Sequence, residues 1–257
     1  MTQCTASSKL IVSFPGNTMS KRVNMSDKWV TYPHGPLEKL ADNLWYVQGT
    51  LPHMPIGRAM TVIKKSTGAL VLHSPIALDD EGMRALETLG EIDTLLIPNG
   101  WHRIDLARYA KRFPQAAIYA PNGAVAKVEE IVKLTGTYDT FPRDPAIELE
   151  TLRGVGEAEG VVKVSSHDGA TLIFNDCIFN LEHFPGIFGT VYRFLGSTGG
   201  PKVTRIFRMM AAKSKNELYA HLAELSSHPS LKRIVVSHGK LIDEKASDVL
   251  REIAGGR

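Results

Sequence analysis

The order of the apolar runs constrains the fold of this chain more than any other feature. Short strand-like runs come first, at 44–47, 60–63 and 69–72, and the Gly-containing turn between the last two predicts a β-hairpin. Helix and strand patterns then alternate. The predicted helices lie at 79–90, 104–112 and 124–134, and the predicted strands between them at 94–97 and 117–120. Such alternation is typical of βαβ units and predicts a partly parallel sheet.

The second half of the chain follows a similar plan. It opens with strands at 147–152, 161–165 and 170–174, and the last two are joined by His167-Asp168-Gly169, in which Asp-Gly is a strong hairpin signal. Predicted helices at 187–195, 202–212 and 215–226, a strand at 233–236 and a helix at 243–253 follow. Two such halves predict two sheets face to face with helices outside, although element order alone also allows a single doubly wound sheet.

The first 36 residues differ from the rest. They are polar and basic, and no apolar run among them is as long as the core of a signal peptide, so we expect a loosely ordered leader at 1–36 and one domain at 37–257. Met19 or Met25 is a possible natural start. No run of about 18 apolar residues occurs, which predicts no membrane span.

The composition is that of an ordinary globular protein, with 43% hydrophobic and 22% charged residues among 257. A formal charge of +3 is too small to indicate a nucleic-acid partner. With only Cys4 and Cys177 there is no disulfide scaffold, so we expect a cytoplasmic protein. The sequence lacks a G-x-S-x-G elbow, a P-loop and a dinucleotide fingerprint, which argues against a serine hydrolase, a P-loop nucleotide-binding protein and a dinucleotide-binding protein.

Three predicted buried strands are each followed by a polar side chain of a type that can bind a metal. His102 follows the strand at 94–97, Asp176 the strand at 170–174, and His238 the strand at 233–236. Polar groups at the carboxyl ends of strands gather at one rim of an α/β sheet, where ligands usually bind. Imidazole and carboxylate together suit one divalent ion such as zinc, or iron or manganese.

Residues 37–250 resemble the metallo-β-lactamase superfamily. The resemblance rests on the stretch from "GALVLHSPIAL" to "IYAP", on "TLIFNDCIFNL" and on "IVVSHGKLI". The closer match is an uncharacterised branch of the superfamily, a domain of unknown function, with "HSPIAL", "PNGWH" and "ND-x-x-FN" as its hallmarks. The resemblance implies a four-layer αββα sandwich. The superfamily's H-x-H-x-D-H signature is degenerate here, because 98–103 contains a single histidine.

The resemblance also implies roles for individual residues. Asp176 matches the bridging aspartate, His238 the final histidine, and His102 lies in the signature. His167 is a weak match to the central histidine, and Arg103 stands near the end of the signature, where a guanidinium can hold an anionic group. Asp105 is at best a substitute ligand.

These residues fit a hydrolase with one metal. Three protein ligands leave a position for water, whose pKa a bound ion lowers to about 7. Such a site would hydrolyse an ester, lactone, amide or phosphoester, with Asp176 and His102 in the catalytic centre and Asp176 orienting the nucleophile. The alternative is a metal-free relative that binds a small anionic ligand, at Arg103, or a protein partner. The sequence specifies neither substrate nor oligomeric state.

Each candidate also has a structural interpretation. His102 could cap a helix or stack on Trp101, Asp176 could bond backbone N–H groups, and His238 could be a turn residue. His167 could be an exposed residue of a hairpin turn, and His73 could be a buried structural histidine. Asp105 could be an acidic residue in the first turn of a helix, where the helix dipole favours it. The aromatic and basic stretch 184–208 is either a pair of amphipathic helices over the sheet, or a lid or interface.

Overall fold

The computed structural model describes residues 27–256, and it has two mixed β-sheets packed face to face. The strands of the first sheet lie in chain order. They are β1 (Glu38–Ala41), β2 (Leu44–Thr50), β3 (Gly57–Lys64), β4 (Leu70–His73), β5 (Ile92–Leu96), β6 (Ala117–Ala120) and β7 (Gly136–Thr137). The second sheet has the order β11-β10-β9-β8, with β12 paired in parallel to β10. Its strands are β8 (Ile147–Thr151), β9 (Gly160–Ser166), β10 (Gly169–Leu181), β11 (Gly200–Val203) and β12 (Leu231–Gly239).

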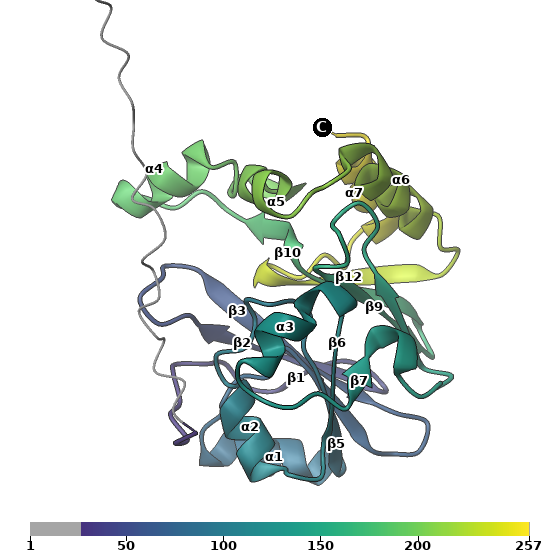
Figure 1. Ribbon diagram of the computed structural model, residues 1–257. Coiled ribbons are helices and arrows are strands. Elements are labelled where there is room, and N and C mark those ends of the chain that lie inside the picture. The colour runs from purple at the N-terminus through teal and green to yellow at the C-terminus, as the bar shows by residue number, and fades with distance from the viewer. Residues whose placement is uncertain (1–26, 257) are drawn as a thin grey trace, which may run out of the picture.

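Helices cover the outer faces of both sheets (Figure 1). On the first sheet lie α1 (Asp80–Leu89), α2 (Leu106–Arg112), and α3 (Val125–Glu129) after a 3-10 turn at Asn122–Ala124; a second 3-10 turn spans Tyr138–Thr140. On the second lie α6 (Lys215–Ser226) and α7 (Ala246–Ala254), whereas α4 (Gly186–Phe194) and α5 (Arg205–Met210) extend to one side of them. No helix in the part of the chain that the structure describes has the length and apolarity needed to cross a membrane.

Three separate apolar cores hold these four layers together. Alternate residues of a strand point to opposite faces, so each inner strand serves two cores. In β4, Leu70 and Leu72 pack toward the helices of the first sheet, whereas Val71 packs between the sheets. In β10, Leu172 packs toward the helices of the second sheet and Ile173 packs between the sheets. This arrangement confirms the predicted αββα sandwich.

Several elements have bounds other than those predicted. The helix expected at 124–134 ends at Glu129, because Thr135 exchanges hydrogen bonds with the backbone of Ile118 in β6 and draws the chain back to the sheet. The helix expected at 202–212 begins as strand β11, which pairs with β10, and only from Arg205 is it helical, after Thr204 caps it. The strand expected at 170–174 continues to Leu181.

The packed body extends ahead of residue 37, where the leader was predicted to end. The indole of Trp29 donates a hydrogen bond to the carbonyl of Leu78 (2.8 Å) and packs against Tyr109, with 5.0 Å between ring centroids. Arg108 donates to the carbonyl of Lys28 (2.9 Å). Residues 28–36 therefore pack on the domain, and the rest of the predicted leader, residues 1–26, lies outside the described residues.

Candidate metal centre

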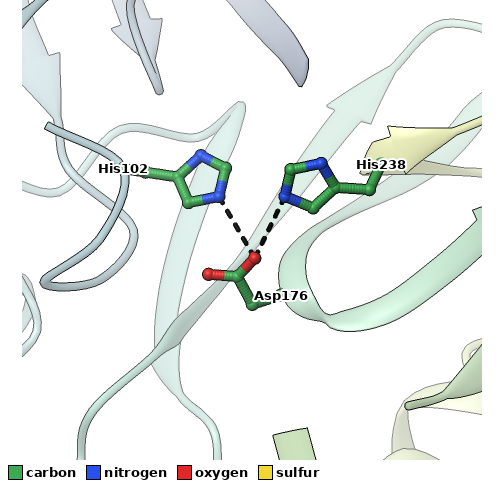
Figure 2. Close-up of side chains that lie close together, drawn as sticks. All are labelled: His102, Asp176 and His238. Carbon is green, nitrogen blue, oxygen red and sulfur yellow. Dashed lines mark hydrogen bonds and ion pairs between the residues drawn. The ribbon is translucent and has the colours of Figure 1, made fainter. Parts of the chain in front are cut away.

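His102, Asp176 and His238 converge at one edge of the sandwich, from three separate segments (Figure 2). His102 lies on the loop that follows β5, and His238 near the end of β12. Asp176 lies within β10, where Phe174 and Phe179 pair with positions of β12 that are only two residues apart. The extra residues of β10 form a bulge, and this bulge turns Asp176 toward the two histidines.

The spacing of the three side chains matches the coordination shell of a small divalent ion. Oδ1 of Asp176 lies 3.2 Å from Nε2 of His102 and 3.1 Å from Nε2 of His238. The three ligand atoms all lie within 4.8 Å of one another. Zinc bonds of about 2.0–2.1 Å in tetrahedral geometry place neighbouring ligand atoms about 3.3 Å apart. The two measured separations are therefore close to those of a zinc site.

The hydrogen bonding of His238 also fits a cation at this position. Its Nδ1 lies 2.6 Å from the carbonyl oxygen of Gly57, and a carbonyl can only accept, so Nδ1 carries a hydrogen. A neutral His238 then presents the lone pair of Nε2 to the Asp176 carboxylate. Two electron-rich atoms at that distance repel each other unless a proton or a cation lies between them. A divalent ion removes this repulsion, so the residues fit a metal.

Ser74 orients the ring of His102. Its Oγ lies 3.0 Å from Nδ1 of His102, and its backbone N–H bonds the carbonyl of Leu96 (3.0 Å). Ser74 has a φ of 55°, a left-handed conformation that few residues other than glycine adopt without strain. The strained serine of "HSPIAL" thus supplies the outer contact that metal-binding histidines usually have.

Asn99 connects the loop of His102 to Asp176. Its side-chain oxygen accepts from the backbone N–H of Trp101 (2.9 Å) and of His102 (3.1 Å), which closes the turn that positions the imidazole. Its amide nitrogen donates to Oδ2 of Asp176 (2.7 Å) and to Oε2 of Glu159 (2.9 Å). The "PNGWH" segment therefore supplies one candidate ligand, His102, and a buried asparagine that holds another, Asp176, in place.

Glu159 is a residue of the site that sequence reasoning missed. Its carboxylate is fully buried and accepts from the backbone N–H groups of Asn175 (3.3 Å), Asp176 (3.1 Å) and Cys177 (2.9 Å). These are the residues of the β10 bulge, so Glu159 fixes the backbone that carries Asp176. No local pattern marks Glu159, because it lies in the connection before β9 and acts on a segment 16 to 18 positions away.

The pKa values of the two carboxyl groups of the site, Asp176 and Glu159, are shifted in opposite directions. Burial alone would raise the pKa of Asp176, but the imidazoles of His102 and His238 outweigh it and hold the pKa well below its ordinary value. Burial, and then the negative charge of Asp176, raise the pKa of Glu159 above its ordinary value, although N–H donors oppose this rise. Asp176 is therefore kept ionised beside two imidazoles, as a metal ligand must be.

The structure corrects two of the predicted site residues. His167 lies in the exposed turn before β10, with its backbone bonded to Asp42, and seven or more residues of strand separate it from Asp176. At about 3.3 Å per residue it is roughly 20 Å or more from the cluster and cannot be a fourth ligand. Arg103 turns away from the site and pairs with Glu130 (2.8 Å) on the far side of the loop, so it presents no free guanidinium to an anion there.

Asp105 does not join the candidate metal ligands, and although it is the N-cap residue of α2, its side chain does not cap the helix. Its fully buried carboxylate bonds Arg58 (2.5 Å), Arg108 and the backbone N–H of Ala77 (3.1 Å), and its side chain makes no capping bond to the helix. His73 is also buried, in β4, and burial followed by the charge of His102 lowers the pKa of His73 to about 3. It is therefore a neutral interior histidine.

A cavity of about 910 Å³ opens onto the three converging residues. Its walls come from the loops around residues 51–58 and 74–75, from the loop of His102, and from α4 and α5. The apolar side chains of Phe188, Val191, Ile206 and Phe207 line the same cavity as the candidate ligands. Part of the stretch 184–208 therefore lines the cavity; its predicted role as a lid or an interface stays a prediction.

Solved structures with the same architecture decide the fold. The DIM-1 metallo-β-lactamase, in a crystal exposed to ceftazidime, superposes with a TM-score of 0.60 at 13% identity over 88% of this chain and 99% of that one. The chain has the metallo-β-lactamase fold. FIM-1 from Pseudomonas aeruginosa, in a mono-zinc form, gives 0.58 at 10% identity over 90% and 98%. A metallo-β-lactamase from Erythrobacter litoralis, with β-mercaptoethanol in its active site, gives 0.58 at 12% over 86% and 96%.

Sequence comparison does not assign the chain to a family. No protein-family model and no curated protein matched the chain. At 10 to 13% identity the structural neighbours share the fold, and function has to be argued from the site itself.

Proposed function

We propose that this protein is a hydrolase that uses one divalent metal ion to cleave an ester, lactone, amide or phosphoester. The observation that carries the proposal is the convergence of the Nε2 atoms of His102 and His238 on the ionised carboxylate of Asp176, at separations typical of zinc ligands. An ion held there would supply a Lewis acid that polarises the substrate and makes water nucleophilic near neutral pH.

The side chains around the site would then have distinct tasks. His102, Asp176 and His238 bind the ion, and three protein ligands leave room for water and substrate. The second carboxylate oxygen of Asp176 accepts from Asn99, so the carboxylate is held in one orientation beside the reacting water. Because the outer contacts fix both imidazoles, the site is organised before a substrate arrives.

A single metal fits the chain better than a pair. Within residues 27–256 only one group of three potential ligands converges, and the segment 98–103 contains a single histidine. FIM-1, which has the same fold, has been solved in a mono-zinc form, and this supports one zinc as sufficient for a stable site. Zinc is the first choice, and iron or manganese remain candidates.

The alternative of a metal-free, anion-binding relative loses its main support. It was motivated by Arg103, which pairs with Glu130 outside the cavity. Arg58 does line the cavity, but it is buried and its guanidinium donates to the carboxylate of Asp105. Neither arginine therefore presents a free guanidinium to an anion in the cavity, and the hydrolase is the better proposal.

The test is metal-dependent hydrolysis. Protein stripped with a chelator is reloaded with zinc, manganese or ferrous iron and assayed on a 4-nitrophenyl ester, a lactone, an anilide and a phosphodiester. We expect at least one class to be cleaved only after reloading, and cleavage to be lost in Asp176→Ala and His238→Ala. His167→Ala, which removes an exposed histidine outside the site, is the matched control and should retain activity. No cleavage of any class, or cleavage that survives both variants, would contradict the proposal.

A further inference from the structure

The exposed apolar side chains of this protein gather around one cavity. Ten large apolar side chains among the described residues are more than one-third exposed. Six of them line the cavity over the candidate metal centre, namely Met54, Trp101, Phe188, Val191, Ile206 and Met210. Scattered exposed apolar residues need no explanation, whereas a contiguous group around a concave site marks a surface that binds an apolar partner or ligand.

Most of the side chains that line this cavity are apolar. The polar ones, besides Arg58, are the candidate ligands His102, Asp176 and His238 with Ser74, the uncharged Tyr192, Ser197 and Thr204 of the α4–α5 segment, and His53. Arg58, the cationic side chain of the wall, is only 5% exposed and is paired with Asp105. A ligand with charges along its length would bury them without partners, which costs several kcal/mol. An apolar chain that carries one polar head group avoids this cost.

The size and flexibility of the cavity suit a long chain. Its volume of about 910 Å³ is near the upper end of the range of about 300–1,000 Å³ for small-molecule sites. Two of the six side chains, Met54 and Met210, are methionines, whose unbranched side chains adapt to the shape of a ligand. Side chains of α4 and α5 line the same cavity as the candidate ligands, so an apolar chain that packs on these helices can place its head group at the ligands.

We infer that the cavity binds a long-chain acyl compound, with its carbonyl or carboxylate at the His102–Asp176–His238 end and its chain along α4 and α5. The inference deepens the proposed function and rests on it for the position of the head group. The substrate would be a long-chain acyl ester. Its hydrolysis adds the oxygen of water to the acyl carbon, breaks the acyl–oxygen bond and transfers a proton to the departing alcohol, which yields a fatty acid.

Neighbouring residues on α4 and α5 provide matched controls. Phe188 lines the cavity, whereas Ile187 beside it does not and is 83% exposed. Met210 lines the cavity, whereas Met209 does not and is 85% exposed. An aspartate at each position adds the same charge to the same helix, inside the cavity in one case and outside it in the other.

The experiment is calorimetric titration of zinc-loaded and chelator-treated protein with dodecanoate and with butyrate, below micellar concentrations. We expect saturable binding of dodecanoate and much weaker binding of butyrate. Phe188→Asp and Met210→Asp should weaken dodecanoate binding about tenfold to a hundredfold, as the loss of one buried apolar contact predicts, and Ile187→Asp and Met209→Asp should leave it unchanged. Circular dichroism and thermal unfolding verify that all four variants fold.

The outcomes separate this inference from the proposed function. Selective dodecanoate binding supports the inference even if no metal form cleaves an ester, in which case the proposed function fails alone. Dodecanoate binding no tighter than butyrate binding overturns it, even if short esters are cleaved. An equal effect of all four aspartate variants also overturns it, because the binding would then not depend on the cavity wall.

Discussion

Replacement of Asp105 by asparagine tests how the buried charges beneath the candidate metal centre are balanced. The carboxylate lies between the guanidinium groups of Arg58 and Arg108, and the three side chains are 0%, 5% and 3% exposed. Asp105→Asn preserves the shape of the side chain and removes its negative charge. Both arginines then remain buried without an anionic partner.

The expected loss of stability follows from that burial. Removal of one partner of a buried ion pair costs about 3–5 kcal/mol, because a charge is left uncompensated in a medium of low polarity. A domain is typically stable by only about 5–15 kcal/mol, so Asp105→Asn should remove about a fifth or more of that margin. A second change, Arg58→Met, removes one of the two unpaired charges and should recover part of the loss.

The assay is equilibrium unfolding in urea at neutral pH, with a chelator present so that bound metal does not contribute. Asp248→Asn is the control, since Asp248 forms a mostly exposed pair with Arg251 and should cost at most about 1 kcal/mol. The variant should bind as much zinc as the wild type, because Asp105 is not a ligand. Unchanged stability, or loss of metal at unchanged stability, would refute this reasoning.

Three further predictions concern the surroundings of the site. Glu159→Gln places amide hydrogens against the backbone N–H groups from which the carboxylate accepts hydrogen bonds. It should lower zinc affinity about 10- to 100-fold, measured by competition with a chelator. Unchanged affinity would argue against the role of Glu159 in positioning Asp176. Ser74→Ala frees the ring of His102 and should lower zinc affinity about tenfold in the same assay, whereas an unaltered affinity would exclude Ser74 as an orienting residue. Burial lowers the pKa of His73 to about 3, so its contribution to stability is complete above the unfolded value of 6.5 and is lost as the pH falls toward 3. Between about pH 7.5 and pH 5 the wild type should lose about 2 kcal/mol of its free energy of unfolding through His73. In urea unfolding, His73→Leu should therefore lose about 2 kcal/mol less than the wild type over this range. An equal loss in both proteins would show that other groups titrate.

The convergence of the three candidate ligands was predictable because each follows a local sequence signal. His102, Asp176 and His238 come after strands that can be recognised by their own composition, and strands in an α/β sheet deliver their ends to a common rim. The position of His167 could have been corrected from the sequence itself. His167 precedes the predicted strand at 170–174 and Asp176 follows it, so the two residues belong at opposite ends of that predicted strand.

The residues that support the ligands were not predictable in the same way. Glu159 acts on the backbone of a bulge in β10, and Asn99 connects two carboxylates that are 60 and 77 positions away. Such contacts depend on how the two sheets are docked, which no local pattern records. The direction of Arg103 likewise depends on Glu130 in the segment after α3, a partner that is close only once the chain is folded.

The most direct test of the metal centre is elemental analysis of the protein purified without added metal or chelator. It is compared with the double variant Asp176→Ala/His238→Ala and with His167→Ala. The structure predicts about one equivalent of zinc, iron or manganese per chain in the wild type and in His167→Ala, and none in the double variant. Wild-type protein that holds no metal even after incubation with excess zinc or manganese, or a double variant that retains the full equivalent, would contradict the proposed site.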